Sequence, residues 1–372
     1  MRDQATQFAG AIEQGLAECD NEISCRVSRV RYHILSNAPQ YFPELRDKFT
    51  VETSFPYRSS SLIARFCIDD GTCRKGIVAK WAPVYRENNE GLTEFTNYRI
   101  FNSVYRSELE FQCPTALAFL SEDNVLLTLE EPGLTLREIL CRWFDNGISR
   151  SDLNSTLRAV GKWLRAYHQL SRPVEAGMDT GTENGLRYLH RCWATDADVS
   201  ELLGSHGLAL EQARKIADDP TILGELMVGR LHNDLWPGNI VVGKGKVTVL
   251  DAACNRAGVQ FADIACFSTC VSLMGVTHFR SNDSRRLLAE SFIAGYFGEA
   301  AVPSHLKRGL ALLRLNAIAG NLERHCRRLA ELPYPYRAAA RSFLRRVYGS
   351  LINAAIRDLS GSWEAVPKGE SD

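Results

Sequence analysis

The sequence predicts an α+β fold of two lobes, in which a small antiparallel sheet precedes a larger and mainly helical part. Three observations lead to this prediction. Apolar β-rich runs alternate with turns between residues 49 and 129, the pattern breaks at residues 130–133, and helical periodicity follows from residue 152. The chain then divides into a helical N-terminal extension (1–45), a sheet lobe (46–132), a helical lobe (133–359) and a disordered tail (360–372).

The extension is expected to be helical because Phe8, Ile12 and Leu16 share one helical face, and a second apolar pattern runs from Ile23 to Leu35. Two roles remain open for it: it caps the small lobe, or it contacts another subunit. The sheet lobe follows, with Asp69-Asp70-Gly71 as a turn. Its expected strands are residues 49–55, 62–68, 76–81, 115–120 and 125–129.

Composition limits which cellular compartment and which kinds of partner are expected. The 372 residues carry 44 basic and 44 acidic side chains, so net charge points neither to nucleic acid nor to a membrane surface. Eleven cysteines without a C-x-x-C pair argue against a disulfide framework and against a zinc site. There is no signal peptide pattern and no long apolar span. A reduced, cytoplasmic protein is therefore expected, with its oligomeric state open.

The most informative stretch is Leu231–Asp251, which reads LHNDLWPGNIVVGKGKVTVLD. Asp234 is followed by Asn239 five residues later and by Asp251 twelve residues after that. Between them, two β-rich runs flank the turn signal at residues 243–246, which predicts a hairpin. The hairpin would return Asp251 to the side of the loop that carries Asp234. A carboxylate that accepts a hydroxyl proton, with hard oxygen ligands for Mg²⁺ nearby, suits phosphoryl transfer.

This stretch resembles the catalytic loop of the aminoglycoside phosphotransferase/choline kinase group of kinase-like enzymes, and in part that of fructosamine kinases. The resemblance is densest over residues 231–265. It implies a two-lobed protein kinase-like fold, ATP and Mg²⁺ as cofactors, Asp234 as the catalytic residue, and Asn239 and Asp251 as metal ligands. Two departures stand out. Asn233 replaces the usual Gly, and Ala252-Ala253-Cys254 follows Asp251 in place of the commoner Trp-Glu.

The sheet lobe supplies the expected nucleotide site. Ile77-Val78-Ala79-Lys80 resembles the kinase strand whose lysine grips the α- and β-phosphates, although a single strand lysine is normally solvated. Glu94 is the expected partner of Lys80, with Glu90 and Glu87 as substitutes. The turn at Ser59, Ser60 and Ser61 lacks glycine. Its hydroxyl and N–H groups are expected to cover the phosphates, unless it is an ordinary surface turn.

The resemblance also assigns the connecting segments. Residues 126–133 resemble the hinge that binds adenine through its backbone, which places the backbone of Glu130 and Glu131 at the nucleotide. The alternative for their side chains is that they are solvated acids of a turn. Apolar residues at helical spacing predict an amphipathic helix over residues 152–170, with His168 packed in the core rather than reactive. Asp263 is expected to hold the catalytic loop through backbone hydrogen bonds.

The acceptor is the least determined part of the prediction. The run between Asp251 and Asp263 is too short for a protein kinase activation segment, and no G-x-G-x-x-G occurs, which favours a small-molecule acceptor. Residues 301–358 hold eleven basic and three acidic residues. If these basic side chains line the acceptor site, they favour a neutral or anionic acceptor. If they do not, they form a solvated helix face. Alternatives are an aminoglycoside or fructosamine-type kinase, or a catalytically silent nucleotide-binding protein.

Overall fold

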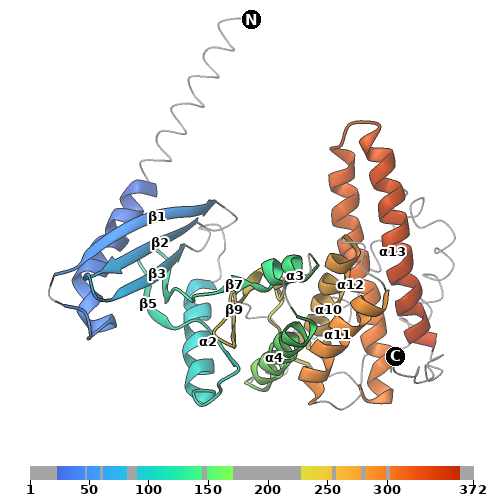
Figure 1. Ribbon diagram of the computed structural model, residues 1–372, viewed down its shortest axis with the longest axis horizontal. Coiled ribbons are helices and arrows are strands. Elements are labelled where there is room, and N and C mark those ends of the chain that lie inside the picture. The colour runs from blue at the N-terminus through green and yellow to red at the C-terminus, as the bar shows by residue number, and fades with distance from the viewer. Residues whose placement is uncertain are drawn as a thin grey trace, which may run out of the picture. The chain divides into compact units, whose positions relative to one another are not determined.

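The protein was studied as a computed structural model, in which the chain forms two compact units (Figure 1). The first unit comprises Met1–Val104 with Pro114–Glu131, and the second comprises Tyr105–Cys113 with Pro132–Asp372. Each unit is treated by itself below. The structure describes residues 23–46, 48–58, 62–81, 90–144, 149–170, 228–253, 257–277, 282–298 and 302–360.

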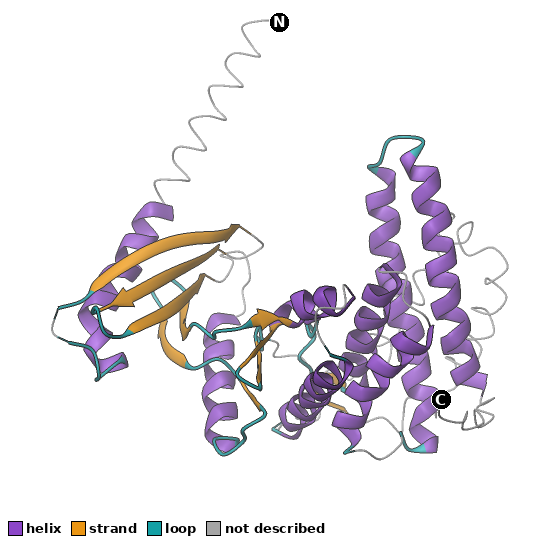
Figure 2. Ribbon diagram, viewed as in Figure 1, coloured by secondary structure: helices purple, strands orange, loops and turns teal. Residues whose placement is uncertain are grey.

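The first unit is built on a five-stranded sheet of order β1-β2-β3-β6-β5, with every neighbouring pair antiparallel (Figure 2). The strands form where the sequence alternates apolar residues with polar or small ones, and Gly71 at φ +82° turns the chain between the second and third. The bounds are β1 Thr50–Arg58, β2 Leu62–Asp69, β3 Arg74–Trp81, β5 Ala116–Leu120 and β6 Val125–Leu129.

One face of this sheet packs on a helix described over residues 23–41, which therefore belongs to the core of the unit. The helix contributes apolar residues at helical spacing, and the sheet contributes alternate residues of its central strands. Burying each large side chain is worth about 1.5–3 kcal/mol, so this interface stabilises the unit. The fully buried members include Val30, Ile34, Ala38, Phe66, Ile68, Ile77 and Val125.

Helix α2, Glu90–Val104, packs beside β5 and β6 of the same sheet. Its buried side chains include Glu94, Tyr98 and Phe101, which recur at three and four residues and so lie on one helical face. Phe95, on the same helix, is only partly buried and lies beneath the guanidinium of Arg99.

The second unit begins with a small sheet of order β4-β10-β9-β7, and a separate pair, β8 with β11. The predicted hairpin is confirmed as β9–β10, with a tighter turn than expected. Only Lys244 and Gly245 lie outside the strands, at φ +51° and +75°. The bounds are β4 Phe111–Gln112, β7 Leu134–Thr135, β8 Val228–Arg230, β9 Ile240–Gly243, β10 Lys246–Val249 and β11 Ala257–Val259.

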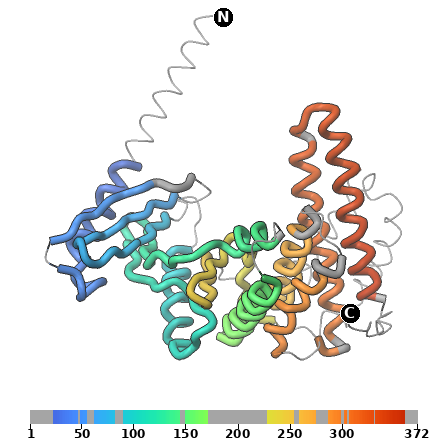
Figure 3. The backbone as a smooth tube through the Cα atoms, in the orientation of Figure 1, coloured from blue at the N-terminus to red at the C-terminus, as the bar shows by residue number. Residues whose placement is uncertain are grey.

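Helices make up the rest of the second unit. The predicted amphipathic helix is confirmed as α4, which buries Leu157, Val160, Leu164 and Tyr167, and packs closely against α11. The last two helices form a long antiparallel pair, whose backbone is followed in Figure 3. The bounds are α3 Leu136–Phe144, α4 Arg150–Gln169, α10 Phe261–Thr277, α11 Asn282–Phe297, α12 Ser304–Ala330 and α13 Tyr336–Ser360.

Among the described helices, none combines the length and the apolar character that crossing a membrane requires.

Candidate active site

Lys80 and Glu94 form an ion pair in the first unit, with Nζ and Oε2 2.8 Å apart. Glu94 is buried, and its second carboxylate oxygen accepts a hydrogen bond from the Tyr98 hydroxyl. A buried carboxylate is costly unless it is paired and hydrogen-bonded, and both conditions hold here. Glu94, the expected partner, is therefore placed against Lys80.

The sheet register fixes which face Lys80 occupies. Lys80 is paired with Ile63 on β2 and with Leu126 on β6, and paired residues of antiparallel strands share a face. The neighbours of Lys80 on its own strand, Ala79 and Trp81, are buried in the core against the helix at residues 23–41. Lys80 consequently lies on the opposite face of the sheet.

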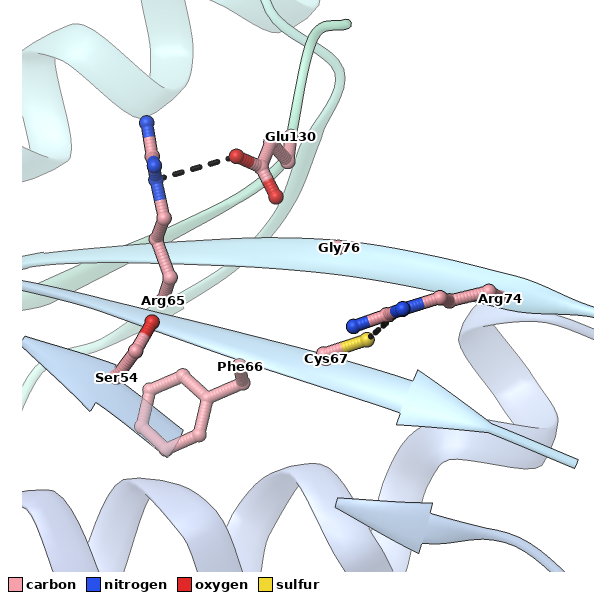
Figure 4. A pocket seen from close by; sticks show the side chains of 7 residues that line it. All are labelled: Ser54, Arg65, Phe66, Cys67, Arg74, Gly76 and Glu130. Atoms are coloured by element: carbon pink, nitrogen blue, oxygen red, sulfur yellow. Dashed lines mark hydrogen bonds and ion pairs between the residues drawn. The ribbon is translucent and has the colours of Figure 1, made fainter. Parts of the chain in front are cut away.

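A shallow pocket of about 330 Å³ opens on this same face beside the hinge segment (Figure 4). Glu130 donates its backbone N–H to the carbonyl of Gly76 at 2.8 Å, and its carboxylate pairs with Arg65 Nε at 3.1 Å. The side chain of Glu130 is thus an ion-pair partner rather than a solvated turn acid. Glu131, the next residue, is partly buried. The pocket is lined by Ser54, Arg65, Phe66, Cys67, Arg74, Gly76 and Glu130.

Ser59, Ser60 and Ser61, and the alternative glutamate Glu87, lie outside the described residues.

The loop between β8 and β9 carries Asp234 and Asn239 in the second unit. Pro237–Asn239 form one turn of 3₁₀ helix, η2, which brings Asn239 back toward Asp234. The amide nitrogen of Asn239 donates to the Asp234 carbonyl at 3.1 Å and to its carboxylate at 3.0 Å. Asn239 is buried, whereas Asp234 is exposed. A buried amide thus orients a carboxylate that faces solvent.

Asp251 is brought to the same loop by the hairpin. The residue before it, Leu250, donates its N–H to the Asn239 carbonyl at 2.8 Å. Asp251 itself has φ +60°, a left-handed conformation that Asp and Asn adopt more readily than other non-glycine residues. The three residues singled out from the sequence, Asp234, Asn239 and Asp251, are therefore gathered around one loop.

His232 joins the two ends of this loop. Its Nε2 lies 3.0 Å from the Leu250 carbonyl, and its Nδ1 lies 3.3 Å from the backbone N–H of Asp234. A carbonyl accepts and an N–H donates, so the two partners together require the neutral tautomer with hydrogen on Nε2. Burial lowers the pKa of His232, although the charges of Asp263 and Asp251 oppose this. Both arguments assign a neutral imidazole.

Asp263, near the start of α10, holds the loop backbone as the sequence predicts. Its carboxylate accepts the N–H groups of His232 at 2.7 Å and of Asn233 at 2.8 Å. Asn233 has φ +63°, which explains why this position suits glycine and why asparagine can replace it. The departure at Asn233 thus preserves the backbone geometry of the loop.

A buried polar network extends from Asp263. His168 lies between Asp263 Oδ2 at 3.1 Å and the Tyr296 hydroxyl at 3.0 Å, so its predicted packing role is confirmed. Burial would raise the pKa of Asp263, but the hydrogen bond and charge of His168 and the bond from His232 outweigh it, and the pKa is lowered. Tyr296 of α11 was not foreseen, because it lies 128 residues from its partner and no local pattern marks it.

Within the described ranges, no three His, Cys, Asp or Glu side chains converge as a ready-made metal site. Besides the Asp234 carboxylate, the loop and the end of the hairpin bring together the oxygen-bearing side chains of Asn239 and Asp251.

Comparison with known proteins places this site in a family. Residues 98–304 match the sequence model described as the phosphotransferase enzyme family, which is more than half of the chain. No curated protein matches the sequence.

Three solved structures are similar in fold. A glucosamine kinase, in complex with glucosamine, ADP and inorganic phosphate, has a TM-score of 0.55 at 14% identity and covers 84% of each chain. Amicoumacin kinase hAmiN, in complex with AMP-PNP, Ca²⁺ and Ami, has a TM-score of 0.53 at 13% identity, over 89% of this chain and 96% of its own. A choline/ethanolamine kinase family protein from Mesorhizobium loti has a TM-score of 0.50 at 13% identity, over 87% and 99%. The chain therefore belongs to the phosphotransferase enzyme family and has a protein kinase-like α+β fold.

Proposed function

We propose that the protein transfers the γ-phosphoryl group of ATP, with Mg²⁺, to a hydroxyl of a small-molecule acceptor that is neutral or anionic. The observation that carries this proposal is the hydrogen bond from the Asn239 amide to the Asp234 carboxylate. It leaves Asp234 exposed but fixed in direction, as a group that receives a substrate proton must be. Membership of a phosphotransferase family supplies the reaction class.

Asp234 is assigned as the catalytic base. The acceptor oxygen forms a bond to the γ-phosphorus, the bond from that phosphorus to the β-bridging oxygen breaks, and ADP leaves. The hydroxyl proton passes to a carboxylate oxygen of Asp234. His232 and Asp263 are positioning residues, since they bond to the loop backbone and not to the reacting groups.

Asn239 and Asp251 are assigned to Mg²⁺, and their chemistry fits this ion. Mg²⁺ prefers oxygen ligands and usually takes only one or two carboxylates from the protein, with phosphate and water completing its shell. The Asn239 nitrogen is already bonded to Asp234, so its oxygen is the atom available to a cation. When bound, the ion would neutralise charge on the phosphates.

The nucleotide is assigned to the first unit. Lys80, oriented by Glu94, is proposed to hold the α- and β-phosphates, with Ser59, Ser60 and Ser61 at the γ-phosphate end. The backbone at Glu130 and Glu131 is proposed to bind adenine. Support comes from the Lys80–Glu94 ion pair and from the position of Lys80 on the face away from the core.

The test is ADP release with Mg²⁺, measured first without acceptor and then against a metabolite library. The wild type should hydrolyse ATP slowly by itself and faster with its acceptor. Asp234→Asn should lower the acceptor-stimulated rate by about 10²–10⁴-fold, the usual contribution of a positioned base. Asp251→Ala should abolish Mg²⁺-dependent turnover while metal-free ATP binding survives. Glu331→Gln, which changes an exposed carboxylate at the end of α12, is the matched control.

Two other outcomes would replace the proposal. ATP binding without any hydrolysis would identify a catalytically silent nucleotide-binding protein. Stimulation by aminoglycosides or by fructosamines, rather than by neutral or anionic compounds, would identify one of those kinase types instead.

A further inference from the structure

The turn that joins α12 to α13 presents large apolar side chains to solvent. Leu332, Tyr334 and Tyr336 fall within five residues and are 38%, 83% and 69% exposed. Every residue from 331 to 339 is exposed as well. Within the second unit, the turn lies at the end of the long antiparallel pair, beyond the ends of α10 and α11 (Figure 2). Apolar side chains that gather on one projecting end, rather than being scattered singly, indicate a contact surface.

Hydrogen bonds within the turn fix its shape. The Arg337 guanidinium donates from Nε and Nη2 to the Leu332 carbonyl, at 3.1 and 3.0 Å. The backbone N–H of Arg337 donates to the Pro333 carbonyl at 3.2 Å, and that of Ala338 donates to the Pro335 carbonyl at 3.0 Å. Each proline also restricts its own φ. The rings are therefore carried by backbone that is already ordered, so binding through this turn costs little further conformational entropy.

Positive charge surrounds the turn. Residues 323–346 hold seven arginines and two glutamates, although the whole chain carries no net charge. Arg328 lies in the last turn of α12, and Arg337 lies in the first turn of α13. Of the two glutamates, Glu323 is buried and already paired with Arg327. The neutral balance of the chain thus conceals a strongly basic end of one helix pair.

We propose that this turn binds the surface of a bilayer that contains anionic lipids. Leu332, Tyr334 and Tyr336 would lie at the level of the headgroups, with the arginines around them against the lipid phosphates and carboxylates. Tyrosine suits this boundary because its ring is apolar while its hydroxyl stays in contact with water. Basic side chains gain from the negative potential of an anionic leaflet. The proposal goes beyond phosphoryl transfer and does not depend on it.

The size and charge of the surface favour a lipid partner over a protein. A specific protein–protein interface takes about 20–30 residues from each partner. The exposed turn, residues 331–339, offers far fewer. A second copy of the chain would also bring two groups of arginines together, which like-charge repulsion opposes. A bilayer surface requires neither a large interface nor a complementary shape, and it supplies the opposite charge.

Binding can be tested without nucleotide or acceptor. The full-length protein is co-sedimented with large vesicles of phosphatidylcholine alone, or of phosphatidylcholine mixed with phosphatidylserine. The wild type should bind the mixed vesicles and be left in the supernatant by phosphatidylcholine alone. Rising salt should release it from the mixed vesicles, because screening shortens the reach of the surface potential.

Variants of the turn separate the contributions of the rings and the charges. Tyr334→Ser/Tyr336→Ser should weaken binding to the mixed vesicles about tenfold, because it removes apolar area from the interface. Tyr334→Phe/Tyr336→Phe, which keeps the rings, should bind as the wild type does. Arg328→Gln/Arg341→Gln should weaken binding about tenfold to thirtyfold, the value of two basic side chains at an anionic surface. Thermal melting establishes that each variant is folded.

The matched controls are changed outside the turn. Tyr32→Ser replaces a tyrosine that is 74% exposed in the first unit, and Arg99→Gln/Arg106→Gln removes two exposed arginines of that unit. Both controls should bind the mixed vesicles as the wild type does. The proposal is overturned if the wild type binds neither kind of vesicle, binds both equally, or loses as much affinity through Tyr32→Ser as through the turn variants. A wild-type dimer without vesicles that Tyr334→Ser/Tyr336→Ser abolishes would instead assign the turn to a second copy of the chain.

Discussion

Asp263 shows at the scale of single residues how a loop without regular structure is held. The loop between β8 and β9 exposes backbone N–H groups that have no strand or helix partner. The Asp263 carboxylate accepts two of them, from His232 and Asn233, and the Asn239 side chain bonds to Asp234. Charge-assisted bonds to backbone N–H groups are about twice as strong as neutral ones, so a single buried carboxylate can fix the loop.

Asn233 allows the backbone requirement to be tested. Because it is exposed and has φ +63°, its replacement changes little packing and mainly tests the left-handed conformation. Asn233→Gly should leave the free energy of unfolding nearly unchanged. Asn233→Val should lower it by about 1–2 kcal/mol, the cost of this conformation for a residue with a branched Cβ. Denaturant unfolding measures both. Equal stability of the two variants would show that the loop does not enforce this φ.

Burial of Glu94 changes what a substitution at Lys80 measures. Lys80→Ala removes one partner of a buried carboxylate, so it should weaken nucleotide use and also destabilise the protein by about 1–3 kcal/mol. The double variant Lys80→Ala/Glu94→Gln should recover much of the stability and none of the nucleotide use. Thermal melting and the KM for ATP separate the two effects. If Lys80→Ala changes melting but not the ATP KM, Lys80 is structural only.

At the scale of elements, helices α4 and α11 meet at two glycines. A Cβ on Gly161 would lie 2.2 Å from the Phe292 carbonyl oxygen, and one on Gly295 would lie 2.1 Å from that of Arg158. The backbones therefore approach more closely than any side chain allows. This contact sets the position of His168 on α4 relative to Tyr296 on α11, and so supports the polar network that includes Asp263.

Gly161→Ala should consequently destabilise the protein although alanine is the better helix former. The gain in helix propensity is about 1 kcal/mol, and the clash with backbone that cannot rotate away should exceed it, for a net loss of about 1–3 kcal/mol. The control is Ser155→Ala, an exposed position on the same helix. Thermal melting compares the two variants. A rise in Tm for Gly161→Ala would mean that the helices separate easily.

Elements with a local pattern were predictable, and those without one were not. The strands of the first unit and helix α4 follow from alternation and helical periodicity over five or more residues. Strand β4 has only two residues, too few for any period. It pairs with β10 in parallel, and the Gln112 side chain bonds to Thr248, 136 residues away. Such a pairing is decided by the packed structure and leaves no local trace in the sequence.

At the scale of the whole molecule, the same distinction holds for the site. Asp234, Asn239 and Asp251 could be grouped from the sequence because a short loop and a hairpin join them. The packing of α10 against α12 could not, since it joins helices that are separated along the chain and leaves no local pattern. The basic excess of residues 301–358 is visible in the sequence, but which arginines are neutralised is not. Arg314 and Arg327 have acidic partners, and Arg324 has none among the described residues.

Histidines with lowered pKa values in both units make the free energy of unfolding depend on pH. Burial lowers the pKa of His33, His232 and His325 below the ordinary value of 6.5, with the charges of Arg328 and Arg324 adding to the effect at His325. The unfolded chain takes up these protons near pH 6.5, whereas the native protein resists them. Stability from these groups is therefore present above about pH 6.5 and is lost as the pH falls below it. The lowered pKa of Asp263 acts in a separate window, below about pH 4, where the unfolded carboxyl is protonated.

We therefore expect Tm to be nearly constant from pH 8 to 7 and to fall progressively from pH 6.5 to 5. His232 is almost completely buried, so it should contribute the largest share, up to about 1.4 kcal/mol of unfolding free energy per pH unit. His232→Gln, whose amide can still donate to the Leu250 carbonyl, should lower Tm at pH 8 but flatten its dependence between pH 6.5 and 5. His33→Gln, at a less buried histidine of the other unit, should flatten it less. If the Tm of His232→Gln falls with pH in parallel with that of the wild type, His232 is protonated as readily in the folded loop as in the unfolded chain. The neutral tautomer would then not hold the loop.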